Sequence, residues 1–224
     1  MNVDVAKNLH EVLGNLPKEV RLVAISKYHP NEYLETAYNE GQRIFGESHE
    51  QELAQKQETL PKDIEWHFIG HLQTNKIKQI VPFVALIHGV DSFKLLKEIN
   101  KEGEKIGRII PCLLQIHIAK EETKFGFGFE ECRELFLTDN LKDLKFIQVR
   151  GLMGMATLTD NASEIHSEFK SLKSYFDQLQ KEFFPNDSTF CHLSMGMSDD
   201  YKIAIEEGSS MVRIGSAIFG ARVY

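Results

Sequence analysis

Short apolar runs alternate with helical segments along this 224-residue chain, and this alternation constrains the fold more than any other feature. Eight runs read as strands, because they are short, rich in branched or aromatic residues, and bounded by glycine, proline or polar residues. They cover residues 22–26, 43–45, 66–69, 85–90, 109–118, 146–149, 189–193 and 211–214. Such alternation is typical of a mainly parallel sheet. Eight units at this length predict a closed (β/α)8 TIM barrel, with an open doubly wound sheet as the alternative.

The segments between these runs carry helical signals. The clearest covers residues 165–183, where apolar side chains recur at alternating spacings of four and three. Ser48 is expected to cap a helix that reaches Lys56, and Pro82 to stop a helix over 75–81. Further helices are expected over 92–103, 130–137 and 198–207, and an amphipathic lead-in predicts an extra N-terminal helix. No linker, low-complexity segment or repeat divides the chain, so we expect a single domain over residues 1–224.

Composition excludes several classes of function. The formal net charge of −7 and the pI near 5.7 argue against a nucleic-acid partner, since phosphate binding needs a basic face. No apolar run is long enough to span a bilayer, and the N-terminus lacks the features of a signal peptide. The three cysteines are widely spaced, which favours reduced thiols. We therefore expect a cytoplasmic protein with no nucleic-acid or membrane partner. The expected oligomeric state is a monomer.

Lys27 follows the first apolar run directly, and this placement makes it the first candidate functional residue. The continuously apolar run suits a strand covered on both faces. A lysine that closes such a strand can place its amine in a pocket, where desolvation lowers the pKa of the amine and favours attack on a carbonyl. The alternative is a solvated lysine at the tip of a strand.

The segments after the seventh and eighth strands carry residues suited to an anion. Residues 194–200 are mostly small and lead into a helix, and residues 213–220 bring an arginine, a glycine and a hydroxyl. Asp199 and Asp200 would repel a phosphate unless they serve the positive end of the next helix. In a closed barrel the first and eighth strands are neighbours, so an amine nucleophile and a phosphate site would lie together. Pyridoxal 5'-phosphate (PLP) carries both a carbonyl and a phosphate, and it commonly attaches to a lysine.

Six ordered blocks of this sequence resemble the YggS/PROSC family of pyridoxal phosphate homeostasis proteins. The blocks are residues 23–27, 42–47, 66–76, 150–153, 193–200 and 211–220. The resemblance implies a fold similar to the N-terminal barrel of alanine racemase, with PLP held as a Schiff base on Lys27. It also implies that Ser194, Gly215 and Ser216 hold the phosphate and that Arg213 approaches the pyridine nitrogen.

Three further positions bear on such a site. Met153 and Met155 follow the sixth strand and are candidates to line the face of the cofactor, with core filling as the alternative reading. Ser48 stands where the family usually has asparagine, so this position offers a hydroxyl in place of a side-chain amide. An always-charged Arg213 would keep the pyridine from protonating, which weakens the ring as an electron sink.

The resemblance also bears on whether the protein is an enzyme. Racemases of the related fold use a second acid/base, a tyrosine supplied by an additional β domain of the partner subunit. This sequence ends at Tyr224, just beyond the eighth strand, so we expect it to lack that second base. The resemblance implies a non-catalytic PLP carrier or regulator, with PLP-dependent apoenzymes as recipients. The alternative is a small PLP-dependent racemase or lyase that uses Lys27 as its only base.

Other candidate motifs favour structural readings. His67 and His71 would share a face of a helix, but four residues of strand separate them by roughly 13 Å, so no metal site is expected. Cys191 and His192 are adjacent on a predicted strand and should point to opposite faces. The Gly126-Phe127-Gly128 segment lacks the third glycine of a dinucleotide-binding loop.

Overall fold

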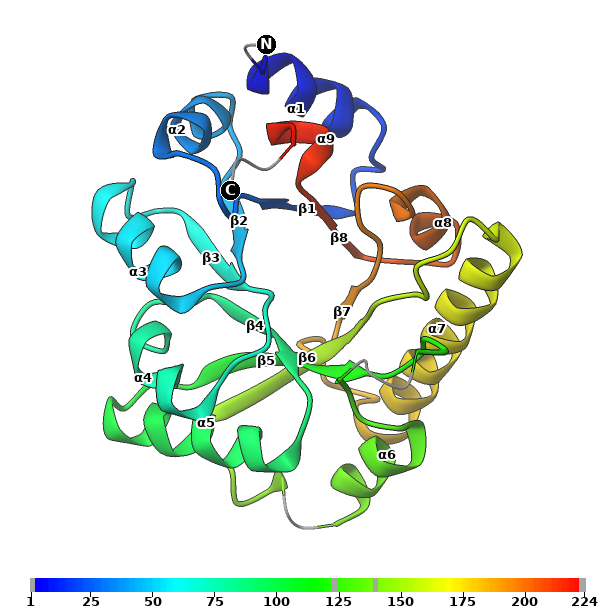
Figure 1. Ribbon diagram of the computed structural model, residues 1–224. Coiled ribbons are helices and arrows are strands. Elements are labelled where there is room, and N and C mark those ends of the chain that lie inside the picture. Colours follow the sequence, from blue (N-terminus) through cyan, green and yellow to red (C-terminus); the bar gives the residue numbers. More distant parts are fainter. Residues whose placement is uncertain (1–2, 122–124, 139–140, 222–224) are drawn as a thin grey trace.

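Eight parallel strands close into a barrel in the order β1 to β8 in a computed structural model that describes residues 3–121, 125–138 and 141–221 (Figure 1). This confirms the predicted TIM barrel. The strands are β1 Arg21–Ile25, β2 Ile44–Glu47, β3 Glu65–Phe68, β4 Leu86–Val90, β5 Ile110–Ile116, β6 Ile147–Gly154, β7 His192–Ser194 and β8 Met211–Ile214.

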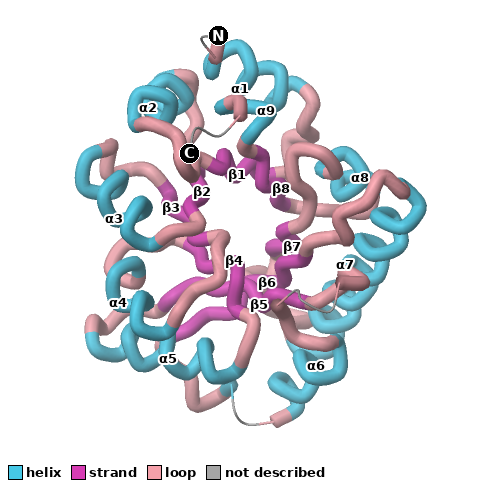
Figure 2. Tube along the Cα trace, viewed as in Figure 1, coloured by secondary structure: helices cyan, strands magenta, loops and turns pink. Residues whose placement is uncertain are grey.

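Helices surround this ring of strands (Figure 2). They are α1 Val5–Gly14, α2 Asn31–Asn39, α3 Glu50–Thr59, the 3₁₀ turn η1 Thr74–Lys76, α4 Ile77–Ile80, α5 Phe93–Lys105, α6 Phe129–Leu137, α7 Ala162–Phe183, α8 Tyr201–Glu206 and α9 Ser216–Phe219. The predicted N-terminal helix is α1, which lies beside α9 (Figure 1), and the Asn8 side-chain amide donates to the Ile218 carbonyl at 3.0 Å. No helix within the described ranges is long and apolar enough to cross a membrane.

The pairing of β1 with β8 closes the barrel. Its parallel register runs from Arg21 opposite Met211 to Ala24 opposite Ile214. Residues that follow β1 and β8 therefore emerge at the same end of the barrel, as the sequence predicted for Lys27 and the 213–220 segment.

Two apolar cores hold the strands in place. The larger lies between the sheet and the helices and includes the buried face of α7 that the spacing of its apolar residues predicted. The smaller fills the barrel interior and is built from Val23, Ile25, Leu86, Leu113, Met153 and Met211. This interior is packed with side chains, so a ligand can enter only above it, where the strands end.

β6 is twice as long as predicted because Gly151 continues the strand instead of ending it. Its φ of 144° is unfavourable for other residues, and a Cβ there would lie 1.8 Å from the His192 carbonyl oxygen of β7. The glycine thus permits a close approach of two strands. β7 is shorter than predicted and begins only at His192.

Two predicted helix boundaries were wrong. Ser48 does not cap α3: the helix begins at Glu50 after His49, and the Ser48 hydroxyl lies 3.2 Å from His49 Nδ1. The helix predicted over 198–207 begins at Tyr201, because the residues before it form a turn. The helix predicted over 75–81 is present at those bounds to within one residue, as the 3₁₀ turn η1 followed by one α-helical turn, α4.

Candidate functional site

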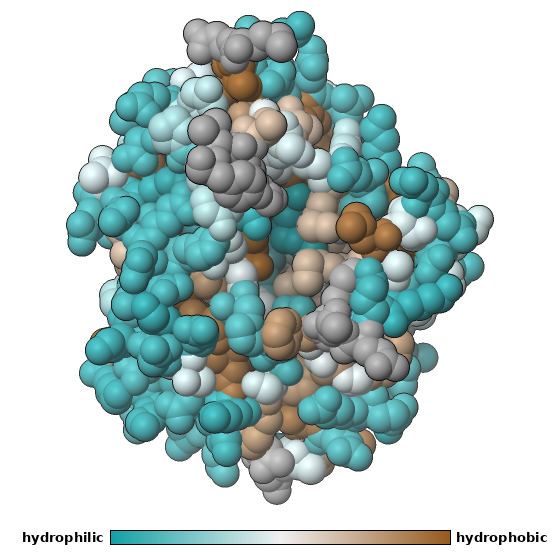
Figure 3. Space-filling model, in the orientation of Figure 1, coloured by the Kyte–Doolittle hydropathy of each residue, from teal (hydrophilic) through white to brown (hydrophobic). Residues whose placement is uncertain are grey.

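A cavity of about 320 Å³ opens where the barrel strands end. Its wall comes from segments that follow β1, β2, β3, β6, β7 and β8, together with residues of β1 and β8 themselves. The lining residues are Ile25, Lys27, Ser48, Ile69, Gly70, Met155, Met197, Ser198, Asp199, Arg213, Gly215 and Ser216. Figure 3 shows polar residues over the outer helices and a hollow near the middle of this view of the molecule.

Lys27 supplies the amine of this cavity, two residues beyond the end of β1. The next residue, Tyr28, has φ 66°, and no other non-glycine residue in the described ranges has a positive φ. Such a conformation is unfavourable for a residue with a side chain and requires support from its surroundings. The backbone therefore turns sharply at the residue after the lysine.

Ser198, Gly215 and Ser216 form the part of the wall suited to an anion. α9 begins at Ser216, so the first N–H groups of this short helix lack partners within it, as in the phosphate sites of many barrels. The Gly215 N–H donates to the Ser198 hydroxyl at 3.3 Å. A Cβ on Gly215 would lie 3.0 Å from the Ile25 carbonyl oxygen, so glycine allows the backbone to approach β1 closely.

The two adjacent aspartates have different surroundings. Asp199 lines the cavity and is exposed. Asp200 accepts a hydrogen bond from the Met197 N–H at 2.5 Å, and burial raises the pKa of its carboxyl. Asp200 therefore stabilises the loop before α8 rather than pointing a second carboxylate at the anion site.

Arg213 is the buried cation at the cavity. Its guanidinium donates to the Ser194 carbonyl at 2.8 Å, to the Ser194 hydroxyl at 2.7 Å and to the Gly154 carbonyl at 3.0 Å. Burial lowers the pKa of Arg213 to about 10, opposed by Asp200, so the group remains charged at neutral pH. Three hydrogen bonds to the barrel wall fix its orientation.

A chain of buried polar groups extends from Arg213 into the barrel interior. The Ser194 hydroxyl lies 3.0 Å from His88 Nδ1, and His88 Nε2 lies 2.9 Å from His67 Nδ1. Burial lowers the pKa of His67 to about 3 and that of His88 well below its ordinary value, so both rings are neutral. Because Arg213 can only donate, a consistent assignment has Ser194 donating to His88 and His88 donating to His67.

The structure separates the predicted site residues into two groups. Lys27, Arg213, Gly215 and Ser216 line the cavity. Ser194 and Met153 do not line it. The Ser194 hydroxyl accepts a hydrogen bond from Arg213, and Met153 belongs to the barrel interior. Met155 lines the wall.

Sequence reasoning missed Ser198, Ile69 and Gly70 as lining residues. Ser198 lies in the 194–200 segment that the sequence indicates, but β7 ends at Ser194 and only the three-dimensional course of the loop places Ser198 at the cavity. Ile69 and Gly70 directly follow β3, so the rule that sites gather after barrel strands could have found them.

His67, His71, Cys191 and His192, the other candidates from the sequence, lie outside the cavity lining. His67 pairs with His88 in the interior, whereas His71 lies 2.9 Å from Asp91 near the surface. The described residues hold no group of three or more side chains placed to bind a metal. Cys191 is exposed and His192 is buried, with Sγ and Nδ1 3.8 Å apart.

Sequence comparison gives the family of this chain. The model of the family "Alanine racemase, N-terminal domain" matches residues 4–223. A pyridoxal phosphate homeostasis protein of Aquifex aeolicus is 40% identical over 205 residues, which cover 91% of this chain and 88% of the relative. The protein of the same name from Schizosaccharomyces pombe is 38% identical over 208 residues, with 92% and 85% covered.

Comparison with solved structures indicates the same family. PipY of Synechococcus elongatus, solved with PLP bound, matches with a TM-score of 0.87 and 34% identity, covering 97% of this chain and all of that one. Alanine racemase from Bartonella henselae matches 99% of this chain with 60% of its own length, at a TM-score of 0.75 and 14% identity, which shows the fold alone. The chain therefore belongs to the alanine racemase N-terminal domain family and, within it, to the pyridoxal phosphate homeostasis proteins.

Proposed function

We propose that this protein binds PLP in the cavity, attached covalently to Lys27, and serves PLP homeostasis without catalytic turnover. The observation that carries the proposal is the presence of one amine and one anion site in the same cavity: Lys27 faces a wall that contains Ser198, Gly215 and Ser216. The names of the relatives and the PLP bound to PipY support the choice of ligand.

The residues of the cavity fit PLP group by group. Ser198 and Ser216 offer hydroxyl donors to the phosphate, the first N–H groups of α9 offer backbone donors, and Gly215 lets the backbone approach closely. Arg213 is the buried donor for the pyridine nitrogen, and Ser194 acts by holding Arg213. Met155 offers an adaptable apolar contact to the ring, while Met153 supports the floor beneath it.

The same residues argue for a carrier. PLP supplies an aldehyde for covalent attachment and a ring that withdraws electrons best when its nitrogen is protonated. Arg213 only donates, so it disfavours that protonation. The cavity wall, as far as the chain is described, contains no tyrosine, histidine or cysteine to serve as a second acid/base opposite Lys27. We propose that the recipients are PLP-dependent apoenzymes and that the protein acts as a monomer.

Replacement of Lys27 by alanine tests the attachment site. The wild-type protein incubated with PLP should show visible absorbance, and borohydride reduction should leave a pyridoxyl label on the Lys27 peptide in mass mapping. Lys27→Ala should lose the absorbance and the label, with an unchanged far-UV circular dichroism spectrum. A label on another lysine, or unchanged absorbance of the variant, would contradict the assignment.

Exchange of substrate protons tests the absence of turnover. The PLP-loaded protein is incubated in deuterium oxide with a panel of L-amino acids, and Cα exchange is followed by nuclear magnetic resonance. We expect no exchange beyond that caused by free PLP. Rapid exchange with any one amino acid that also requires Lys27 would favour a small racemase or lyase.

A further inference from the structure

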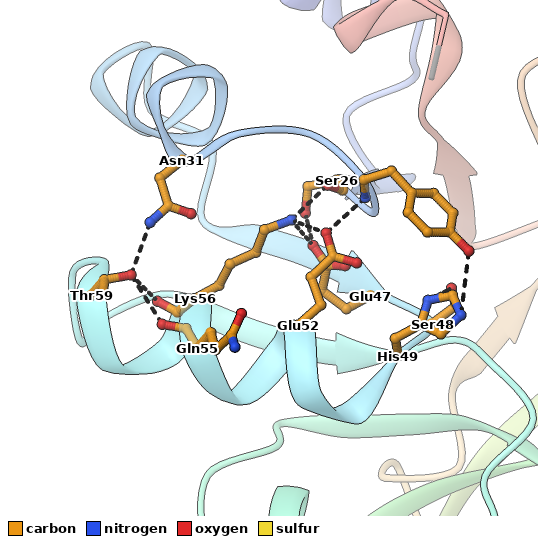
Figure 4. A network of polar contacts seen from close by, with 10 residues as sticks. Ser26, Asn31, Glu47, Ser48, His49, Glu52, Gln55, Lys56 and Thr59 are labelled. Carbon is orange, nitrogen blue, oxygen red and sulfur yellow. Dashed lines mark hydrogen bonds and ion pairs between the residues drawn. The ribbon is translucent and has the colours of Figure 1, made fainter. Parts of the chain in front are cut away.

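The turn that carries Lys27 is held on both sides by side chains of α3. The Ser26 carbonyl accepts a hydrogen bond from Lys56 Nζ at 2.8 Å, and the Tyr28 N–H donates to Glu52 Oε1 at 2.7 Å (Figure 4). Lys56 and Glu52 are one helical turn apart. The residues directly before and directly after Lys27 are thus fixed by the same face of one helix.

These two side chains belong to a buried network. Lys56 Nζ also contacts Glu52 Oε1 at 2.7 Å and Glu47 Oε1 at 2.8 Å, and the Ser26 hydroxyl donates to Glu47 Oε1 at 2.6 Å. The Lys56 side chain is 6% exposed and that of Glu47 is fully buried. All three N–H donors of the ammonium have acceptors, so Lys56 is locked in one orientation. We call Glu47, Glu52 and Lys56 the Lys56 cluster.

The backbone at this turn needs such support. Tyr28 has the positive φ noted above, a conformation that persists only where the surrounding structure enforces it. The hydrogen bond from the Tyr28 N–H to Glu52 acts directly on that residue. Without it, relaxation of Tyr28 toward negative φ would rotate the peptide that follows Lys27 and redirect the lysine.

Stability alone does not account for a buried ion pair at this place. The free energy lost by removing both charges from water is about as large as the free energy gained from their attraction. A protein with an apolar pair of similar volume in their place is often equally stable. Within the described part of the chain, Glu47 Oε2 has no hydrogen-bond partner, and burial raises the pKa of Glu47 to about 7 against the opposing charge of Lys56. A role in holding the turn at residues 26–28 in one geometry would explain why the desolvation of these charges is tolerated.

We propose that Glu47, Glu52 and Lys56 are positioning residues that direct the Lys27 amine into the cavity by fixing the turn at residues 26–28. The inference rests on the proposed function of Lys27 as the attachment site. It assigns the Lys56 cluster a role in binding that acts through the backbone, since none of its three members lines the cavity.

The matched pair Glu52→Ala and Glu52→Gln tests this role. The alanine variant loses the acceptor for the Tyr28 N–H, while the amide oxygen of glutamine keeps an acceptor in the same place. Loss of a hydrogen bond to a charged group predicts PLP affinity about tenfold weaker or more for Glu52→Ala, and within about threefold of wild type for Glu52→Gln. Glu50→Ala is the control, because it removes an ion pair of the same helix, Lys76 to Glu50 at 3.1 Å, that does not touch the turn.

Two readouts on the PLP-free protein separate positioning from general stability. Hydrogen exchange should become faster in the peptide containing Tyr28 for Glu52→Ala, with α7 unchanged. Reductive methylation of Lys27, followed by mass mapping, should change its rate in the same variant and remain at the wild-type rate in Glu50→Ala. Equal loss of PLP affinity in Glu52→Ala and Glu50→Ala, or wild-type behaviour of Glu52→Ala, would overturn the proposal.

A second variant guards against loss of fold. The double change Glu47→Leu with Lys56→Met keeps the wall filled and removes both charges, so its melting temperature should stay close to that of wild type while PLP binds about tenfold more weakly. If it binds PLP as wild type does, the proposal is wrong. If wild-type protein itself fails to retain PLP on Lys27, the proposed function fails instead, and the PLP-free readouts still decide whether the cluster fixes the turn.

Discussion

At the scale of single residues, the structure distinguishes two serines that the sequence presents as equivalent. Ser194 and Ser198 lie in one short segment, and both follow the seventh strand. Ser194 ends the strand and is fully buried, with its hydroxyl between Arg213 and His88. Ser198 lines the cavity beside Gly215. The sequence predicts that this loop meets an anion, but which hydroxyl faces the anion depends on where the strand ends.

Alanine substitutions at the two serines test this distinction. Ser198→Ala should weaken binding of PLP by roughly tenfold, because it removes one charge-assisted hydrogen bond to the phosphate. Binding of pyridoxal, which lacks the phosphate, should change little. Ser194→Ala should alter the absorbance spectrum of bound PLP through Arg213 more than the affinity. Fluorescence titrations measure the affinities for PLP and for pyridoxal, and absorbance spectra record the effect on bound PLP. Ser163→Ala, on the exposed surface of α7, is the control. A larger loss of PLP affinity in Ser194→Ala than in Ser198→Ala would contradict the assignment.

At the scale of elements, the sequence predicted the type and order of the strands and the larger helices, because apolar spacing is a strong local signal. It misplaced ends where tertiary contacts decide. Gly151 reads as the end of a strand, yet its lack of a side chain lets β6 lie close to β7. α9 was not predicted, because four residues carry too little periodicity to show a helix. Lys27 and the anion segments could be paired from the sequence, since neighbouring strands in a closed barrel bring their ends together.

The cost of a side chain at Gly151 tests this account of β6. A methyl group there meets the His192 carbonyl oxygen, and the φ of 144° is unfavourable for alanine. Gly151→Ala should therefore lower the free energy of unfolding by roughly 3 kcal/mol or more in urea denaturation. Gly14→Ala is the control: Gly14 ends α1 with open space around its Cα, so alanine should be neutral or stabilising by up to about 1 kcal/mol. Similar effects of the two changes would show that β6 and β7 can separate at little cost.

At the scale of the whole molecule, the barrel interior is divided between apolar packing and a polar chain. Val23, Leu113 and Met153 fill part of it, while His88 of β4 and His67 of β3 continue the hydrogen-bonded series that starts at Ser194. In the assigned hydrogen bonds, Nδ1 of each ring is an acceptor, and an acceptor nitrogen must carry no proton. This series of hydrogen bonds is therefore stable only while both rings are neutral. Polar residues in this interior therefore tie the stability of the fold to pH.

The sign of this pH dependence follows from the shifted groups. In the native state the pKa of His67 is about 3, that of His88 is also far below its ordinary value of 6.5, and burial lowers that of His192 to about 4. As pH falls below about 6.5, the unfolded chain binds protons on these histidines that the native state does not, so the free energy of unfolding decreases. Glu47 acts in the opposite sense: its native pKa of about 7 lies above the ordinary 4.5, so it adds stability as pH falls through that range.

Three histidines outweigh one glutamate, so the net effect between pH 6 and 4.5 should be a loss of roughly 2–3 kcal/mol per pH unit. Urea denaturation at several pH values measures this slope directly. His88→Gln removes one of the groups that titrate in the unfolded chain, so about one proton fewer should be taken up on unfolding. The slope of unfolding free energy against pH should become smaller accordingly, whatever the effect on absolute stability. His10→Gln is the control, since His10 lies on the exposed face of α1 beside Glu40. A free energy of unfolding that is as high at pH 5 as at pH 7 would show that the buried histidines accept protons in the native barrel, and the assigned hydrogen-bond chain would then be wrong.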